Sequence, residues 1–282
     1  MNIQHRSGIW NLESGIEGEI KPILLISASD SSASAGMQVD LRVIQNLGAM
    51  ARCAVTAVTV QGNSGANSIN PVHPDVIADS IYTALADTPG IGAVKIGLLG
   101  DETTAEILEA PLSMINALDI PIVLDPVMRS TPGSALSTEG TARAIYEKVL
   151  PWITLLTPNR SELNEFSILT GSTDQEEAAK VRGVMESGVG AILVTGGDTE
   201  EDHCLDTLYG PGNETSEFKH PRIGTKAPRG TGCALSTTIA VHLSRGISTA
   251  EAVGWSIDYV TGLIEQASEV GEQLLLLAGK NP

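Results

Sequence analysis

Residues 225–246 place a thiol directly behind a glycine turn, at the start of an apolar run with helical spacing. The turn reads Gly230, Thr231, Gly232 and Cys233. The first N–H groups of a helix have no partner within it. Together with the helix dipole they attract phosphate, or charge that develops on a phosphoryl group. Glycine lets the backbone come close to such a ligand. These residues therefore predict an anion-binding turn.

Cys233 has two interpretations from its position alone. A helix N-terminus lowers the pKa of a thiol and favours the thiolate, so Cys233 can act as a base or a nucleophile. The alternative is a small side chain that packs at the start of the helix. A single Gly-x-Gly is weak evidence for a nucleotide site, and the GxxxxGK[ST] pattern occurs nowhere in the chain.

The stretch TPNRSEL carries a second possible site, formed by Asn159 and Glu162. Residues three apart share a helical face, and an amide and a carboxylate at this spacing can hold hydrated Mg²⁺ through water. A polar residue followed three positions later by glutamate is also the ordinary start of a helix, the capping box. Both interpretations stay open.

Strands and helices alternate along the chain from Lys21 onward. This rhythm predicts an α/β fold with a mostly parallel central sheet flanked by helices on both faces. A small antiparallel addition is expected at one edge, over residues 203–210 and 215–223. The expected parallel strands are residues 22–27, 53–61, 93–99, 120–127, 153–159 and 191–197. The expected helices are residues 35–47, 73–87, 103–118, 160–171, 232–244 and 249–266. A further helix is expected before residue 191, and a weaker one over residues 271–279.

Polar residues at the carboxyl ends of the parallel strands are the first candidates for a small-molecule site, because ligands bind such sheets there. Each residue by itself has an alternative role as a helix cap or a loop residue. They are Ser29, Asp30, Gln61, Asp125, Asn159 and Thr195.

The composition excludes two classes of partner. The 282 residues include 34 acidic and 17 basic side chains, and the net charge of −17 repels nucleic acid and anionic membranes. No apolar run approaches the roughly 20 residues that span a bilayer. The three cysteines are widely spaced and form no metal-binding pattern, which favours a reduced, cytoplasmic setting. We expect residues 1–20 to form an N-terminal arm and residues 21–282 to form a single domain.

Six blocks of the chain resemble, in order, those of the hydroxymethylpyrimidine/phosphomethylpyrimidine kinases of thiamine biosynthesis. The resemblance extends over residues 22–266. It implies a ribokinase-like fold, usually seen as a homodimer. The blocks are ISASDSSASAGMQVDL, VTAVTVQGNSG, AVKIGLLG, VLDPVM, LLTPNRSE and TKAPRGTGCALS.

The resemblance also implies roles for residues on the substrate side. Asp40 and Gln61 match contacts to the pyrimidine ring and its amino group, and Val127 matches an apolar wall beside that ring. Cys233 matches the residue proposed as the base for the substrate hydroxyl. The turn over residues 230–233 matches an anion hole.

On the nucleotide side, the resemblance assigns Asn159 and Glu162 to a magnesium and phosphate motif, with Asp125 near the metal. Thr195, Thr225, Lys226 and Arg229 complete the expected nucleotide-binding set.

The chain also departs from the pattern of this family. A glycine pair in the first block is Ala33-Ser34, and lysines are replaced by Thr131 and Thr195. Arg229 stands where the family has histidine, and we expect its guanidinium to supply some of the lost positive charge near phosphate.

These residues and the resemblance predict a kinase that uses Mg²⁺ and ATP to phosphorylate hydroxymethylpyrimidine, its monophosphate or both. One alternative is a pyridoxal or pyridoxine kinase, because that ring also carries a hydroxymethyl group. Another is a catalytically weak pyrimidine-binding regulatory protein, which the missing lysines suggest.

Overall fold

The computed structural model describes residues 21–62, 65–86, 90–129, 136–197, 202–224, 228–270 and 273–276. The expected arm over residues 1–20 lies outside the described residues, and so do Thr131, Thr225 and Lys226.

The strands form a sheet with the order β3-β2-β1-β4-β5-β6-β7-β8-β9, and β10 and β11 form a separate hairpin. The pairs from β2 through β1 and β4 to β7 are parallel. The pairs at both edges are antiparallel. The strands are β1 (Ile23–Asp30), β2 (Ala51–Gly62), β3 (Gly65–Pro71), β4 (Ala93–Ile96), β5 (Ile122–Leu124), β6 (Leu155–Leu156), β7 (Ile192–Val194), β8 (His203–Tyr209), β9 (Thr215–Pro221), β10 (Ser268–Val270) and β11 (Gln273–Leu275).

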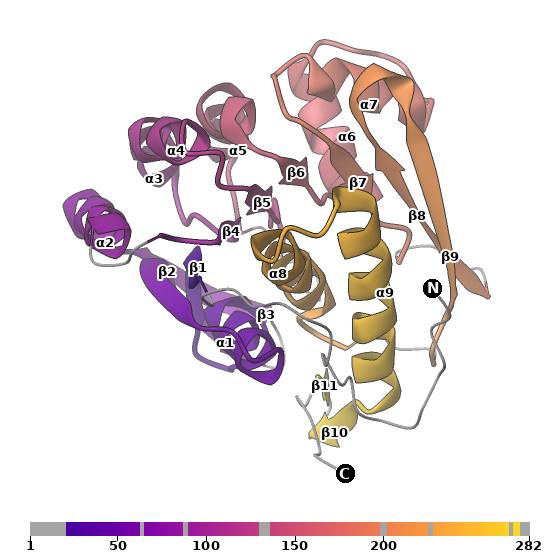
Figure 1. Cartoon of the computed structure of the whole chain (residues 1–282), viewed down its shortest axis with the longest axis horizontal. Coiled ribbons are helices and arrows are strands. Elements are labelled where there is room, and N and C mark those ends of the chain that lie inside the picture. The colour runs from indigo at the N-terminus through magenta and orange to yellow at the C-terminus, as the bar shows by residue number, and fades with distance from the viewer. Residues whose placement is uncertain are drawn as a thin grey trace.

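Helices cover both faces of this sheet (Figure 1). They are α1 (Gly36–Asn46), α2 (Pro74–Ala86), α3 (Glu102–Ile107), α4 (Glu109–Asn116), α5 (Glu139–Ala144), α6 (Arg160–Leu169), α7 (Glu177–Met185), α8 (Thr231–Ser244) and α9 (Thr249–Glu265). Short helical turns are η1 (Ile145–Val149), η2 (Leu150–Trp152) and η3 (Pro211–Asn213). The predicted α/β fold with a mostly parallel sheet is confirmed. Among the described residues, no helix has the length and apolar character to cross a membrane.

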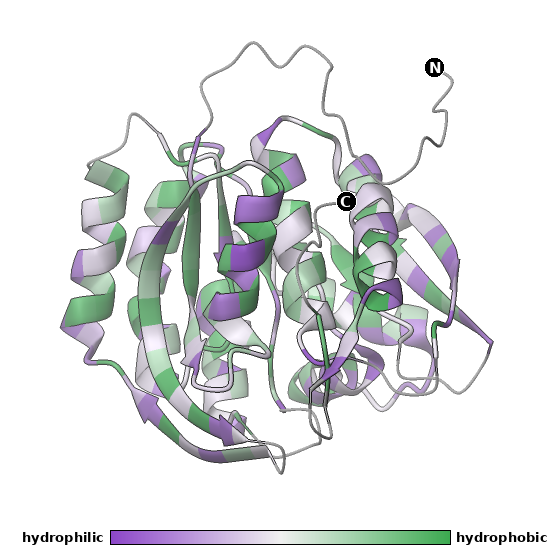
Figure 2. Ribbon diagram, turned by 90° about the horizontal axis from the view of Figure 1, so that it is seen from below, coloured by the Kyte–Doolittle hydropathy of each residue, from purple (hydrophilic) through white to green (hydrophobic). Residues whose placement is uncertain are grey.

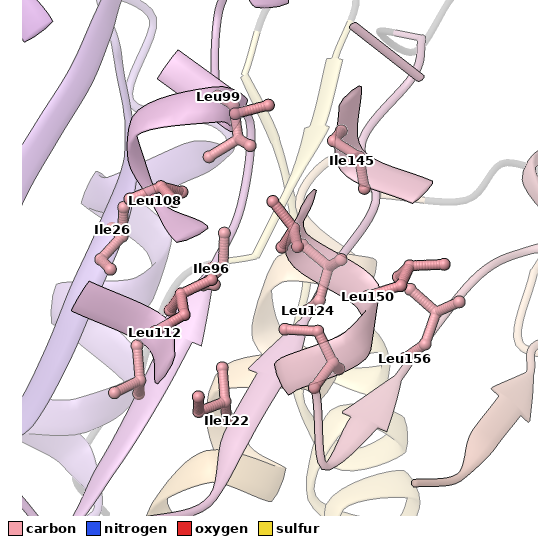
Figure 3. Packing of buried hydrophobic residues seen from close by; sticks show 14 of the residues in the cluster. Ile26, Ile96, Leu99, Leu108, Leu112, Ile122, Leu124, Ile145, Leu150 and Leu156 are labelled. Carbon is pink, nitrogen blue, oxygen red and sulfur yellow. The ribbon is translucent and has the colours of Figure 1, made fainter. Parts of the chain in front are cut away.

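Alternate residues of the central strands build two cores. Leu24 and Ile26 of β1 pack on one face with the apolar sides of α2 to α7, and Figure 3 shows part of this cluster. Ile23 and Leu25 pack on the other face against α1, α8 and α9. Because both faces are covered, these strands are continuous apolar runs, and their hydrophobic residues form the interior seen in Figure 2.

Two predicted helices differ from the structure, and one strand was not predicted. The expected helix over residues 103–118 divides at Leu108. Pro111 has no N–H to donate to the carbonyl of Ile107, so one continuous helix cannot form. The expected weak helix over residues 271–279 is wrong in its described part, because β11 pairs with β10 there. Strand β3 was not predicted, since its polar run GANSINP lacks an alternating apolar pattern.

Helices α8 and α9 meet at a buried histidine. The ring of His242 contacts Trp255 edge-on, with the ring centroids 5.5 Å apart. Burial, followed by the charge of Arg245, lowers the pKa of His242 to about 4. An unfolded histidine has a pKa of about 6.5, so below that pH the unfolded chain takes up this proton first. The stability that this group contributes is therefore complete above pH ~6.5 and is lost as the pH falls toward 4.

We expect His242→Gln to remove this part of the acid sensitivity. Urea unfolding at a series of pH values from neutral to mildly acidic measures it. The parent should lose more free energy of unfolding over this range than His242→Gln loses. Equal losses in the two proteins would contradict the assignment.

Candidate active site

A cleft of about 430 Å³ opens at the carboxyl ends of β1 and β4 to β7. In the sheet, β1 lies between β2 and β4, so the chain reverses its direction of winding beside β1. Open parallel sheets bind ligands at such a switch point. Of the predicted residues, Ser29 does not line the cleft; those that do are Asp30, Gln61, Asp125, Val127, Asn159, Glu162, Thr195, Arg229, Gly230, Thr231, Gly232 and Cys233.

The glycine turn before α8 opens into this cleft. Gly230 is the N-cap residue and has a φ of 85°. A Cβ atom there would lie 2.6 Å from the carbonyl oxygen of Ser34, so a side chain is excluded by both the backbone conformation and the space. The first amides of α8 have no helical acceptor, and Thr231, Gly232 and Cys233 all line the cleft. The geometry fits an anion-binding turn.

Cys233 has a different environment from the one that its sequence position suggests. Its sulfur accepts a hydrogen bond from the Gly36 amide, and its thiol bonds the Asp125 carboxylate. Burial raises the pKa of Cys233, Lys95 lowers it, and the charges of Asp125 and Asp40 raise it again, so that the net shift is upward. The expectation that the helix N-terminus favours the thiolate is therefore corrected. Desolvation and acidic neighbours keep the thiol protonated.

Asn159 and Glu162 form the capping box of α6. The Glu162 amide donates to Asn159 Oδ1 at 2.9 Å, and the Asn159 amide donates to Glu162 Oε2 at 3.0 Å. Glu162 Oε1 also accepts from the Met128 amide at 3.4 Å. Both side chains still line the cleft, so the capping role positions them there. Burial, followed by the charge of Asp125, raises the pKa of Glu162 to about 8.

The two carboxylates fit a hydrated divalent cation in their chemistry. Asp125 and Glu162 line the same cleft, and the charge of Asp125 raises the pKa of Glu162, a conflict that a cation relieves. Within the described part of the chain, no cluster of three or more acidic, histidine or cysteine side chains could enclose a metal. Mg²⁺ does not need one, because it is bound through one or two carboxylates together with water and substrate phosphates.

Asp40 lies behind the cleft rather than in it. It is fully buried on α1 and accepts both hydrogen bonds of Lys95 Nζ, at 3.1 and 2.9 Å. Thr237 of α8 donates to the same carboxylate at 2.8 Å. Its oxygens are therefore used within the protein, and Asp40 does not line the cleft where a pyrimidine contact was expected. Lys95, on β4, was missed because a lysine within an apolar strand gives no sign of its partner.

Arg229, which we expected beside the nucleotide phosphates, lines the cleft and makes its side-chain hydrogen bonds at the end of β2. Its Nη2 donates to Gln61 Oε1, and its Nη1 donates to the Gly62 carbonyl at 3.4 Å. Gln61 Nε2 in turn donates to Thr59 Oγ1 at 2.8 Å. A guanidinium only donates hydrogen bonds, and the sequence does not indicate which acceptors it meets. The fold supplies the acceptors.

The first loop after β1 keeps a glycine-like backbone without glycine. Ala33 has a φ of 55°, in the left-handed region that favours glycine. Asp30 Oδ2 accepts from the Ala35 amide at 3.0 Å, and its Oδ1 accepts from the Ser32 amide at 2.9 Å. These bonds hold the loop although Ala33 replaces a glycine of the resembling motif.

The antiparallel edge contributes residues that sequence reasoning missed. Asp206 of β8 accepts from the Gly196 amide at 2.7 Å, and its other oxygen lies 3.3 Å from His220 Nε2 of β9. Both side chains line the cleft beside Thr195, which forms a parallel bridge with Asn159. Apolar residues of α9 line the same cleft: Ile257, Val260 and Ile264. Pairing between strands brings these residues in, and no motif marks them.

Comparisons with known proteins place this cleft in a family. The sequence model of the phosphomethylpyrimidine kinase family matches residues 30–277. The chain belongs to this family. It is 32% identical over 256 residues to the hydroxymethylpyrimidine/phosphomethylpyrimidine kinase of Rhizobium meliloti, covering 88% of this chain and 93% of that one. It is 31% identical over 254 residues to the enzyme of that name from Aquifex aeolicus, covering 88% and 96%.

A chloroplastic thiamine biosynthetic bifunctional enzyme of Arabidopsis thaliana is also 31% identical over 258 residues, which is 89% of this chain but 48% of that protein. This chain therefore spans about half the length of that relative.

Solved structures of this phosphomethylpyrimidine kinase family and of pyridoxal kinases share the fold. Pyridoxal kinase from Staphylococcus aureus, in complex with AMP-PCP and pyridoxal, has a TM-score of 0.81 and 27% identity, covering 93% of this chain and 94% of that chain. Phosphomethylpyrimidine kinase from Clostridium difficile 630 has a TM-score of 0.70 and 26% identity, covering 86% and 98%. The predicted ribokinase-like fold is confirmed, and so is the predicted kinase family.

Proposed function

We propose that this family member transfers the γ-phosphoryl group of ATP to the primary hydroxyl of hydroxymethylpyrimidine, its monophosphate or both, in thiamine biosynthesis. One observation carries the proposal. The turn over residues 230–233 opens into the same cleft as Asn159, Glu162 and Asp125. An anion-binding turn and two carboxylates that could hold Mg²⁺ therefore face one space. The relatives named for this activity, and the neighbour that holds an ATP analogue, support it.

Positioning and charge stabilisation do most of the work in phosphoryl transfer. The amides at the start of α8 receive the charge that develops on the transferring group. Asp125 and Glu162 would hold Mg²⁺, which neutralises phosphate charge when it is bound. Gln61 and Val127 would contact the ring, since both line the cleft, Gln61 at the end of β2 and Val127 after β5.

Cys233 would accept the hydroxyl proton late in the transfer. As the new P–O bond forms and the bond to the leaving ADP breaks, the hydroxyl proton passes to the sulfur. The thiol proton passes to the Asp125 carboxylate, to which Cys233 is already hydrogen-bonded. The thiol thus stays neutral in the resting protein.

An ATP-consumption assay tests the proposal against hydroxymethylpyrimidine, its monophosphate and pyridoxine, with and without a chelator. We expect turnover with a pyrimidine alcohol and none after Mg²⁺ is removed. Turnover with pyridoxine alone would favour the pyridoxal kinase alternative, which the structural match to the Staphylococcus aureus enzyme supports. Tight pyrimidine binding without any turnover would favour a regulatory protein.

The proposal includes a homodimer in a reduced, cytoplasmic setting. The family resemblance supports the homodimer, and the wide spacing of the three cysteines in the sequence supports the setting.

A further inference from the structure

A chain of hydrogen bonds runs across the substrate side of the cleft, from Arg229 through Gln61 to Thr59. Arg229 Nη2 donates to Gln61 Oε1, and Gln61 Nε2 donates to Thr59 Oγ1 at 2.8 Å. The Thr59 hydroxyl then donates to the Ser29 carbonyl at 3.4 Å. All three side chains line the cleft.

The order of donors fixes how the Gln61 carboxamide is turned. A guanidinium has donors only, so the atom that faces Arg229 must be the oxygen. Thr59 uses its one hydroxyl proton on the Ser29 carbonyl, so its oxygen must accept from the amide nitrogen. A flipped carboxamide would set two donors against each other at Arg229. The orientation of Gln61 is thus set by chemistry at both ends.

Arg229 is itself held firmly enough to impose this orientation. Its side chain is 7% exposed, and Nη1 donates to the Gly62 carbonyl at 3.4 Å. Its amide donates to the Leu274 carbonyl of the C-terminal hairpin at 3.2 Å. The next residue, Gly230, is the N-cap of α8, so the guanidinium is anchored beside the anion-binding turn.

The fixed carboxamide keeps one N–H and one oxygen lone pair for a ligand. A donor beside an acceptor matches a ring that carries an amino group next to a ring nitrogen, the pairing that Gln makes with adenine. The ring of pyridoxine carries a hydroxyl next to carbon instead and lacks this edge. We infer that Arg229 is a positioning residue that gives the cleft its preference for aminopyrimidine alcohols, by holding Gln61 in one orientation. The inference rests on the proposed function.

Binding without ATP is the direct test, measured by calorimetry for hydroxymethylpyrimidine and for its analogue that lacks the amino group. We expect Arg229→Met to weaken binding of the amino compound about tenfold, as loss of a charged hydrogen bond predicts. Binding of the analogue, kcat and the KM for ATP should stay within about twofold. Arg229→Lys keeps a donor and should recover most of the affinity. Arg245→Met is the matched control, because Arg245 is a partly buried arginine at the other end of α8 that bonds the Leu47 carbonyl.

A double-mutant cycle separates positioning from simple loss of packing. Gln61→Ala and Arg229→Met together should weaken binding no more than Gln61→Ala alone, because both changes remove the same oriented amide. Thr59→Val removes the other hydrogen bond to Gln61 and, like Arg229→Met, should weaken binding of the amino compound but not of the analogue. It therefore tests the inference even if Arg229→Met does not fold.

Two results would overturn the inference. One is that Arg229→Met, or a folded Thr59→Val, binds the amino compound as tightly as the parent does. The other is that either variant loses the same affinity for both pyrimidines. A parent protein that binds neither pyrimidine would instead overturn the proposed function, and the inference with it.

Discussion

Cys233→Ala should lower kcat by about 10²–10⁴-fold, the usual contribution of a positioned proton acceptor. The structure supports this size because the sulfur lies at the first turn of α8 and is held by the Gly36 amide and by Asp125. The KM for the pyrimidine alcohol should change little, since the ring contacts are made elsewhere in the cleft. Steady-state kinetics with product-phosphate detection gives both constants.

Cys53→Ala serves as the control for Cys233→Ala. Cys53 lies on β2 and is exposed, outside the lining of the cleft. Its replacement should leave kcat near that of the parent. A Cys233→Ala enzyme with near-parental kcat would reject the role of the thiol, while leaving the anion-binding turn in place.

Lys95→Met should cost about 3–5 kcal/mol in the free energy of unfolding, because it leaves a buried carboxylate without its counter-ion. The side chains of Lys95 and Asp40 are both 0% exposed. Burial lowers the pKa of Lys95, but the charges of Asp40 and Asp125 and the hydrogen bond to Asp40 raise it, and the net shift is upward. Urea unfolding measured at neutral pH gives the change.

Two comparisons make the Lys95 result specific to the pair. Asp40→Asn in the Lys95→Met background should recover much of the lost stability, since no unpaired charge then remains. Lys148→Met breaks the exposed pair between Lys148 and Glu109, whose atoms are 3.2 Å apart, and should cost about 0–1 kcal/mol. Similar losses for Lys95→Met and Lys148→Met would show that burial does not set the strength of the inner pair.

The local signals in the sequence correctly predicted the elements that carry the site. The apolar runs predicted the central strands, because strands covered on both faces are largely apolar. The glycine bend predicted the start of α8, and Asn159 with Glu162 predicted the start of α6. The anion-binding turn and the capping box depend on hydrogen bonds within a few residues, so their sequence patterns suffice.

The failures have a physical cause as well. Pro111 was present in the sequence, but the helix that it divides was expected to be continuous. Strand β3 pairs with β2 through its backbone, and its polar side chains do not indicate that pairing. The leucines after Gln273 were assigned to a helix, although β10 provides them with a strand partner.

What the sequence by itself determined is the set of helix starts and strand ends from which a phosphate-binding cleft is built. Only the tertiary structure decided which charges meet there. It paired Asp40 with Lys95, directed Arg229 to Gln61 and raised the pKa of Cys233 among buried carboxylates. These outcomes depend on distance and burial between segments far apart in the chain, and Coulomb energies inside a protein change with both.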